Sequence, residues 1–317
     1  MRVCVLELFP TSRGKATHPG AENIKAALKS TPPSLQVKLV THTTMTSPGF
    51  LEANADVIVM PGGSSAQQAQ ELGVAGRRVI REFVAGGGGY VGVCAGAFLA
   101  LSGYHPPRSL HLLRASALHE WKVSWVTKPS FAAGACYKFP RSPSPQLPAT
   151  NCQPPPPPTH THLQRGHTRV PVLLSPGGSS LLIGKGGERE EEDGSGHSPD
   201  GDAVVVLEGV RFNNGPCMVS MEDTNGGEEG LSPPPGEPEF LATFEQGITA
   251  EDEASMNTAA VCAGVCGKGR VCLLSPHLES TPIQLGSLSK TAPKDPRLQA
   301  CVRRAVEWAG GARGGVM

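Results

Sequence analysis

The residue of this sequence best suited to do chemistry is a cysteine flanked by glycines, Cys94 in the segment Gly92–Gly96. A short apolar run precedes it, and a stretch of small residues that favours a helix follows it. A strand that turns sharply into a helix around one central residue is typical of a nucleophile elbow. The glycines permit the strained turn, and the start of a helix favours the thiolate, the reactive form of cysteine. We therefore predict that Cys94 is a nucleophile.

A thiolate nucleophile needs a base and a group that orients the base. Both residue types follow the apolar run Arg270–Leu274, as His277 and Glu279. Side chains two positions apart in an extended chain point to the same side. Glu279 can then accept a hydrogen bond from one imidazole nitrogen while the other faces Cys94. The predicted catalytic residues are Cys94, His277 and Glu279.

A loop with two glycines, Pro61–Gly63, follows the apolar run Asp56–Met60. Glycines after a buried strand let a backbone N–H approach a ligand closely. We predict that the N–H groups of Gly63 and Ala95 form an oxyanion hole, which would stabilise the charge that develops on a carbonyl oxygen under attack.

The elements that must position these residues alternate between strand and helix in the first hundred residues. Apolar runs and helical periodicity predict strands at Arg2–Leu8, Leu35–Val40, Asp56–Met60 and Tyr90–Val93, and helices at Gly20–Leu28 and Ala75–Ala85. This α/β pattern predicts a mainly parallel sheet with helices on both faces. Ligands of such sheets bind beyond the carboxyl ends of the strands, where Gly63 and Cys94 lie.

The second half of the chain is richer in strand signals. We predict strands at Ala203–Leu207, Cys217–Met221, Phe240–Phe244, Thr258–Val265 and Arg270–Leu274, and a closing helix at Pro296–Ala309. These strands predict hairpins added to the parallel sheet.

Proline-rich and acidic segments interrupt the pattern. Ten of the thirty prolines fall within residues 122–164, five of them consecutively, and we predict a disordered insertion there. Residues 184–202 and 222–239 are predicted to be flexible loops rich in acidic residues, Gly or Pro. The whole chain, 1–317, is otherwise predicted to be a single domain.

The composition limits the classes of partner. Lys and Arg total 28, as do Asp and Glu, so the charge balance favours no nucleic-acid partner. No apolar run is long enough to span a membrane. Nine cysteines without a disulfide framework, and no recognisable leader, predict a cytoplasmic protein. The spacing of Cys262, Cys266 and Cys272 is not that of a metal site, so we expect these side chains to serve as small hydrophobic groups and expect no metal or cofactor.

Together, Pro61–Gly63, Gly92–Gly96 and Ser275–Glu279 resemble class I glutamine amidotransferase-like domains. Within that superfamily, the segments Tyr90–Phe98 and Phe212–Pro216 are similar to the biotin–protein ligase N-terminal domain family. The resemblance implies a flavodoxin-like three-layer α/β/α sandwich and a triad of Cys94, His277 and Glu279. It also implies a substrate pocket that includes Gly62, Phe98 and Asn214.

Two departures from these families shape the expected function. Glutamine-hydrolysing members usually carry Gln four residues after the nucleophile, where this chain has Phe98. The Gly-rich ATP- and biotin-binding loop of biotin ligases is absent from the sequence, so ligase activity is not expected. We expect either hydrolysis of an amide or ester through a Cys94 thioester, with a small molecule or amide as substrate, or a non-catalytic ligand-binding or regulatory module that uses the same pocket.

The ends of the proline-rich insertion suggest that an intron of the gene encodes it. Members of the family run a Trp-x-Arg-Gly segment into a strand, and deletion of the 42 residues 123–164 would join Trp121-Lys122 to Arg165-Gly166. Val123 and Gln164 are encodable by codons that match the two ends of an intron. We hypothesise that this segment is a retained intron, and we expect transcript sequencing to find mainly messages without it. A major message that contains these codons would refute the hypothesis.

Overall fold

The computed structural model describes residues 1–7, 20–29, 35–103, 108–117, 168–183, 205–212, 215–221, 234–245, 258–283 and 293–311. All of them belong to one compact unit, formed by residues 1–118 and 167–317. The predicted insertion at 122–164, the predicted loop at 184–202 and Asn214 lie outside the described residues.

One half of the central sheet is parallel. Its order is β2-β1-β3-β4-β11, and every neighbouring pair runs in the same direction. The strands are β1 (Arg2–Leu6), β2 (Gln36–Val40), β3 (Val57–Met60), β4 (Gly89–Val93) and β11 (Gly269–Leu274). All residues of β3 and β4 are buried, as expected for strands covered on both faces.

The other half of the sheet is antiparallel and continues in the order β11-β10-β9-β6-β7. Its strands are β10 (Ala259–Cys266), β9 (Pro238–Phe244), β6 (Thr168–Leu174) and β7 (Val205–Phe212). Two short strands branch from β10, namely β8 (Met218–Ser220) and its partner β5 (Ala115–Ala117). The predicted addition of antiparallel strands is confirmed.

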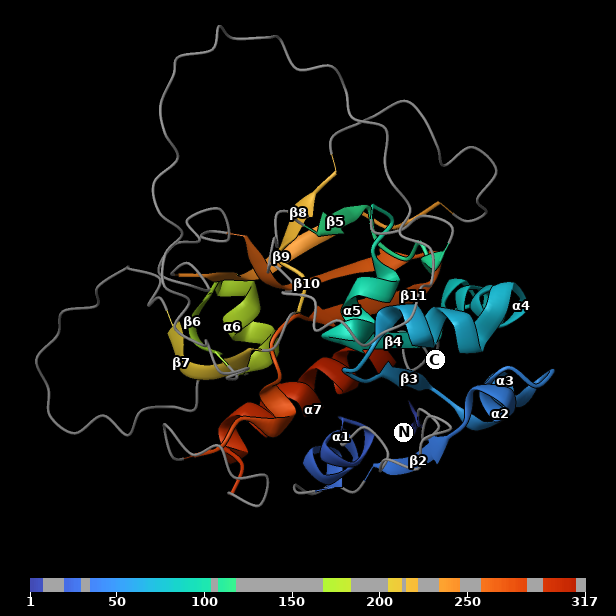
Figure 1. The fold of residues 1–317 in the computed structure, drawn as a ribbon, viewed down its shortest axis with the longest axis horizontal. Helices are drawn as coiled ribbons and strands as arrows, with labels where there is room; N and C mark the ends of the chain where they lie inside the picture. The colour runs from blue at the N-terminus through green and yellow to red at the C-terminus, as the bar shows by residue number, and fades with distance from the viewer. Residues whose placement is uncertain are drawn as a thin grey trace, which may run out of the picture. The chain divides into compact units, whose positions relative to one another are not determined.

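Helices cover both faces of the sheet (Figure 1). On one face α1 (Gly20–Lys29) and α6 (Pro176–Leu182) pack against α7 (Pro296–Gly310), which lies across β3, β4 and β11. On the other face α5 (Ala95–Ala100) packs between the sheet and α4 (Ser65–Ala85), with α2 (His42–Met45) against α4 and α3 (Phe50–Asn54) against α2. The predicted three-layer α/β/α architecture is confirmed.

Helix α4 begins ten residues earlier than predicted. Ser64 caps its start by accepting a hydrogen bond from the N–H of Gln67, at 3.2 Å. The first turns are mostly polar, and Gly73 breaks the helical backbone with a φ of 61°. The apolar periodicity used for the prediction was therefore clear only after this break.

Strand β6 and helix α6 were not predicted. Pro171 lies inside β6, and the pairing with β7 shifts in register between Val170 and Val172. Proline supplies no N–H for the ladder and is typical of such irregular positions. Strand β9 begins at Pro238, two residues inside the loop predicted at 222–239.

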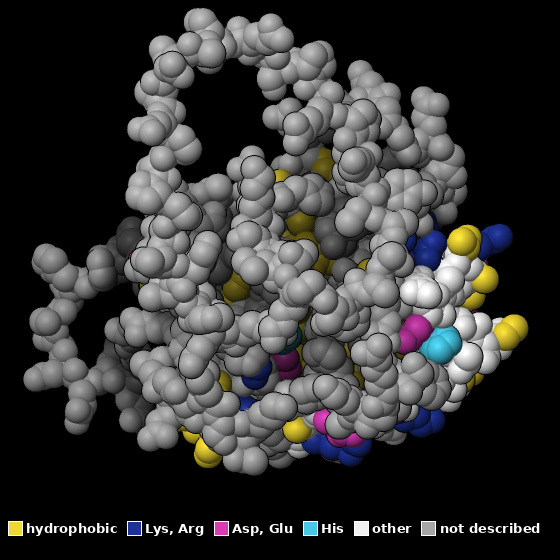
Figure 2. Space-filling model, in the orientation of Figure 1, with side chains coloured by type: hydrophobic (Ala, Val, Ile, Leu, Met, Phe, Trp, Pro, Cys, Tyr) yellow, Lys and Arg dark blue, Asp and Glu magenta, His cyan; other side chains and the backbone are white. Residues whose placement is uncertain are grey.

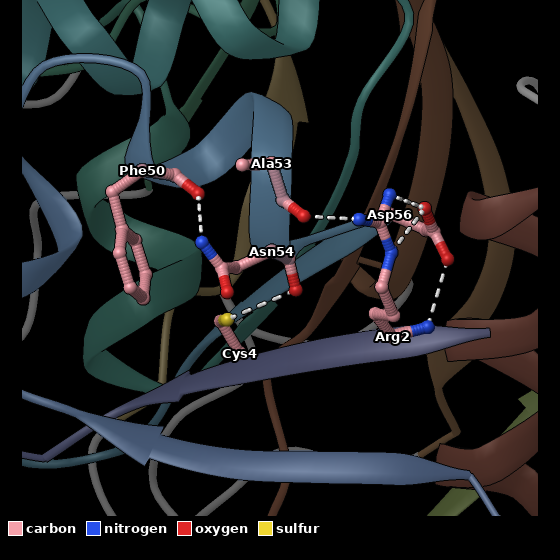
Figure 3. Close-up of polar contacts among 6 residues, drawn as sticks. All are labelled: Arg2, Cys4, Phe50, Ala53, Asn54 and Asp56. Carbon is pink, nitrogen blue, oxygen red and sulfur yellow. Dashed lines mark hydrogen bonds and ion pairs between the residues drawn. The ribbon is translucent and has the colours of Figure 1, made fainter.

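An ion pair links Arg2 and Asp56 at the amino ends of β1 and β3 (Figure 3). Arg2 and Asp56 approach to 2.6 Å, and the backbone N–H of Arg2 donates to the same carboxylate at 2.7 Å. Burial opposes ionisation of Asp56, but these hydrogen bonds to Arg2 lower its pKa below the usual value. The pair therefore lies at the opposite edge of the sheet from the carboxyl ends of the strands.

Side chains of both signs are interspersed on the described surface that faces the viewer in Figure 2. Among the described residues, no helix has the length and apolar character needed to cross a membrane.

Candidate active site

Three segments that are far apart in the sequence meet at one edge of the sheet. Strands β3, β4 and β11 are parallel neighbours and end at Met60, Val93 and Leu274. The segments that carry Gly62, Cys94 and His277 leave these ends directly. The N–H of Cys94 donates to the carbonyl of Leu274 at 2.8 Å, which joins the cysteine segment to the histidine segment.

Cys94 occupies a strained turn between β4 and α5. Its φ of 50° and ψ of −101° are unusual for a residue with a side chain. A Cβ at Gly92 would lie 2.6 Å from the carbonyl oxygen of Gly96, and a Cβ at Gly96 would collide with that of Met60. The buried Tyr90 hydroxyl donates to the same Gly96 carbonyl at 2.7 Å. The two glycines are needed because backbone packs against backbone around the cysteine.

His277 is held by its backbone and by its ring. Its N–H donates to the carbonyl of Arg211 at 2.8 Å, and its own carbonyl accepts from the hydroxyl of Thr281 at 2.8 Å. The ring nitrogen Nδ1 lies 2.8 Å from a carboxylate oxygen of Glu279, which is only 1% exposed. The ring is also hydrogen-bonded to the side chain of Cys94. Because Nδ1 contacts Glu279, the ring nitrogen available to Cys94 is Nε2.

The surroundings of His277 favour its protonated form. Burial lowers the pKa of the imidazole, but the charges of Glu279 and Cys94 and the hydrogen bonds to both outweigh burial and raise the pKa to about 10. The ring is therefore an imidazolium at neutral pH. The positive charge of the ring then lies beside the Cys94 side chain.

The loop after β3 lies against the same ring. A Cβ at Gly62 would lie 2.5 Å from Cε1 of His277, so only glycine leaves room for the imidazole. Gly63 has a φ of 146°, which L side chains rarely adopt. Ala95 is the first residue of α5, and N–H groups of a first helical turn have no partner within the helix.

The predicted pocket residues are described only in part. Gly62 lies in the site, and Phe98 lies one helical turn after Cys94, with its N–H donating to the carbonyl of Cys94 at 3.1 Å. Asn214 lies outside the described residues.

Burial dominates the pKa values of most of the other described cysteines. Cys4, Cys217, Cys262, Cys266, Cys272 and Cys301 are all buried. Burial raises the pKa of Cys272 to about 12 and that of Cys301 to about 11, and it also raises the pKa values of Cys4, Cys262 and Cys266. Among the described residues, no group of three or more His, Cys, Asp or Glu side chains is arranged to hold a metal ion.

Two supporting residues were not found from the sequence. Arg211 and Thr281 bracket His277, and the N–H of Arg211 also donates to the Thr281 hydroxyl at 3.0 Å. Arg211 belongs to β7 at the far end of the sheet order, and no local spacing links it to His277.

Comparison with known proteins supports part of the resemblance. Residues 13–104 match the family model described as biotin-protein ligase, N terminal. This confirms the predicted resemblance over the segment that carries Gly62, Cys94 and Phe98. No curated protein matches the chain.

Solved structures give weaker likenesses. The chain is similar to PurLQS from Thermotoga maritima, with 12% identity and a TM-score of 0.45 over 97% of this chain and 99% of the other. It is similar to a glutamine amidotransferase, with 16% identity and a TM-score of 0.42 over 97% and 100%. It is also similar to the cytoplasmic protein STM3548 from Salmonella typhimurium, with 10% identity and a TM-score of 0.46 over 98% and 99%. These scores carry no functional argument.

Proposed function

We propose that this chain, which matches the biotin–protein ligase N-terminal family over residues 13–104, is a cysteine hydrolase that cleaves an amide or ester through a thioester. The supporting observation is the position of His277, whose ring is hydrogen-bonded to Cys94 on one side and to Glu279 on the other. That order of nucleophile, base and orienting acid is the arrangement that nucleophilic catalysis requires.

In the first step the Cys94 thiolate attacks the substrate carbonyl carbon. The carbonyl oxygen becomes an oxyanion near the N–H groups of Gly63 and Ala95. The carbon–nitrogen or carbon–oxygen bond then breaks, and the leaving amine or alcohol takes the proton of the His277 imidazolium. The acyl group remains on the sulfur as a thioester.

In the second step water releases the acyl group. The thioester sulfur carries no charge, so one of the groups that raise the pKa of His277 is lost and the neutral ring can act as a base. It takes a proton from water, the hydroxide attacks the thioester, and the carbon–sulfur bond breaks. The products are a carboxylic acid and the restored thiolate–imidazolium pair.

We expect iodoacetamide at pH 7 to alkylate Cys94 at least tenfold faster than any other described cysteine. The positively charged ring of His277 is hydrogen-bonded to the side chain of Cys94, whereas burial raises the pKa values of Cys272 and Cys301. Mass spectrometry of the labelled peptides over time measures each rate, and His277→Ala should slow the labelling of Cys94.

His42→Ala is the matched control for that experiment. His42 also lies near a carboxylate, with 3.7 Å between its Nδ1 and an oxygen of Glu71, but it belongs to α2, away from the cysteine. Its loss should leave the labelling of Cys94 unchanged. Equal labelling of all accessible thiols, or no effect of His277→Ala, would contradict the proposed chemistry.

The second candidate function is a non-catalytic ligand-binding or regulatory module with the same pocket. Two observations favour it: Cys94 is only 5% exposed, and Phe98 stands where glutamine-hydrolysing relatives have Gln. Under this alternative, Cys94→Ser would retain ligand binding in full, and the purified protein would show no Cys94-dependent turnover of amides or esters.

A further inference from the structure

Gln68 is a polar side chain enclosed near the start of helix α4, next to the loop that follows β3. It is 0% exposed, and its Nε2 donates a hydrogen bond to the carbonyl of Pro61 at 2.7 Å. Because a carbonyl oxygen can only accept, this contact fixes which end of the amide faces the loop. Oε1 at the other end is also buried and has no hydrogen-bond partner among the described residues.

The unpaired Oε1 makes Gln68 an unfavourable choice for stability. A buried polar atom without a partner loses its hydrogen bonds to water and gains none, whereas an apolar side chain of similar length, such as Met, would bury no such atom. The feature that Gln supplies and Met does not is the bond to Pro61. This indicates that the bond serves the loop rather than the core.

The loop that Gln68 holds is short and lies between β3 and α4. Ser64 anchors its far end as the cap of α4, and the bond from Gln68 anchors its near end at Pro61. The two residues between these anchors are Gly62 and Gly63, and glycine has the widest backbone freedom of any residue. Such a segment holds one conformation only if neighbouring groups restrain it.

The restraint from Gln68 reaches the N–H assigned to the oxyanion hole within one residue. The Pro61 carbonyl belongs to the peptide group that links Pro61 to Gly62, and the next peptide group carries the N–H of Gly63. The ring of His277 closes one side of Gly62, where a Cβ would lie 2.5 Å from Cε1. Gly63 is partly exposed, while Pro61 and Gly62 are buried. A peptide plane fixed at Pro61 therefore helps to set the direction of the Gly63 N–H.

We propose that Gln68 is a positioning residue of the oxyanion hole: by holding the Pro61 carbonyl, it aims the N–H of Gly63 at the carbonyl oxygen of the substrate. It acts through the backbone of the loop rather than on the substrate itself. The inference rests on the proposed hydrolase function, because an oxyanion forms only where a nucleophile attacks a carbonyl group. It adds a residue of α4 to a site otherwise built from the segments that follow β3, β4 and β11.

The test compares two reactions of the same sulfur. Cys94 attacks iodoacetamide at a saturated carbon, so a sulfur–carbon bond forms, iodide leaves and no oxyanion arises. It attacks p-nitrophenyl acetate at the carbonyl carbon, so the carbonyl oxygen becomes an oxyanion before the carbon–oxygen bond breaks and p-nitrophenolate leaves. Water then releases acetate from the sulfur. Both reactions need a reactive sulfur, but only the second needs the oxyanion hole.

Gln68→Met is expected to lower kcat/KM for p-nitrophenyl acetate by about 100-fold, the loss typical of misplacing a catalytic group by about 1 Å. The rate at which iodoacetamide alkylates Cys94 should stay at the wild-type value. Hydrolysis by Cys94→Ala is subtracted as background. Gln67→Met is the matched control, because Gln67 is the neighbouring residue of the same helix and its Nε2 donates to Glu71 at 2.7 Å rather than to the loop. It should leave both reactions unchanged.

Gln68→Glu adds a readout that depends on pH. The introduced carboxyl group has nearly the shape of the amide, but it can donate to the Pro61 carbonyl only while it is protonated. Burial raises the pKa of such a group. Hydrolysis relative to wild type should therefore fall as the pH rises, whereas a general distortion of the site would lower it by the same factor at every pH.

Acetaldehyde extends the test to a reaction without turnover. Cys94 adds to its carbonyl carbon, the second carbon–oxygen bond opens onto the oxygen and no group leaves. The adduct places an oxygen in the oxyanion hole and protects the sulfur from iodoacetamide. Gln68→Met should need about tenfold more acetaldehyde for half protection, the effect of weakening one hydrogen bond to a charged oxygen.

The outcomes separate the two proposals. Equal losses of hydrolysis and alkylation in Gln68→Met, no loss of hydrolysis, or a loss in Gln68→Glu that is the same at every pH overturns the role of Gln68 and leaves the hydrolase proposal standing. Weaker protection by acetaldehyde in Gln68→Met, together with no ester hydrolysis by the wild type, supports the role of Gln68 and removes the hydrolase proposal. A wild-type protein that neither hydrolyses the ester nor is protected by acetaldehyde removes both.

Discussion

Gly62→Ala is expected to lower the reactivity of Cys94 by about 100-fold, the loss typical of displacing a catalytic group by about 1 Å. The new methyl group would lie 2.5 Å from Cε1 of His277, closer than any ordinary contact. The backbone of the loop and the ring cannot both stay in place, and the ring is the part that can rotate away. Its hydrogen bonds to Cys94 and Glu279 would then be lost.

The rate of Cys94 alkylation at pH 7 measures this effect, and the unfolding transition shows whether the fold is kept. Gly20→Ala is the matched control, since its methyl group would approach the other side of the same loop, 3.2 Å from the Gly62 carbonyl oxygen, without meeting the ring. Wild-type reactivity in Gly62→Ala would show that His277 does not act on Cys94.

Glu279→Gln is expected to bring the pKa of His277 down from about 10, to near or below its ordinary value of about 6.5. Burial lowers this pKa, and the charge of Glu279 is the largest of the contributions that raise it. Gln keeps an oxygen that can accept from Nδ1 but carries no charge. The imidazolium, now present up to about pH 10, would be lost at a much lower pH, and with it the positive charge beside the Cys94 side chain at pH 7.

NMR titration of the His277 ring measures this shift, with the signal assigned through His277→Ala. Hydrolysis by Glu279→Gln should fall by roughly 10⁴-fold, as when the carboxylate of a serine protease triad is neutralised. Asp295→Asn is the control, because it removes a buried carboxylate that pairs with Arg297 rather than with His277. An unchanged His277 titration in Glu279→Gln would remove the assigned role of Glu279.

Much of the parallel half of the fold could be predicted because its signals are local. The strands β1, β3 and β4 are continuous apolar runs, and α7 shows its buried face as a periodic pattern that includes Leu298, Val302 and Val306. The pattern was unclear where local signals conflict with tertiary contacts. The polar first half of α4 and the strand β6, which contains a proline, are the examples. A cap at Ser64 starts the helix, and pairing across the sheet holds the strand.

The candidate site, like the fold, could be predicted from the sequence only in part. The residue types and their positions after strands were sufficient to select Cys94, His277, Glu279 and the Gly62–Gly63 loop, because the chemistry of a residue is carried by its type and its neighbours in the chain. Only the tertiary structure decided that β11 lies next to β4 and runs parallel to it, which brings His277 to the cysteine. It also decided that Arg211 and Thr281 hold the histidine and that Gly62 faces its ring. The contacts of His277 with Cys94, Gly62 and Arg211 join segments that are far apart in the sequence. The first two form because burying the apolar strands between two layers of helices leaves the ends of β3, β4 and β11 together at one edge.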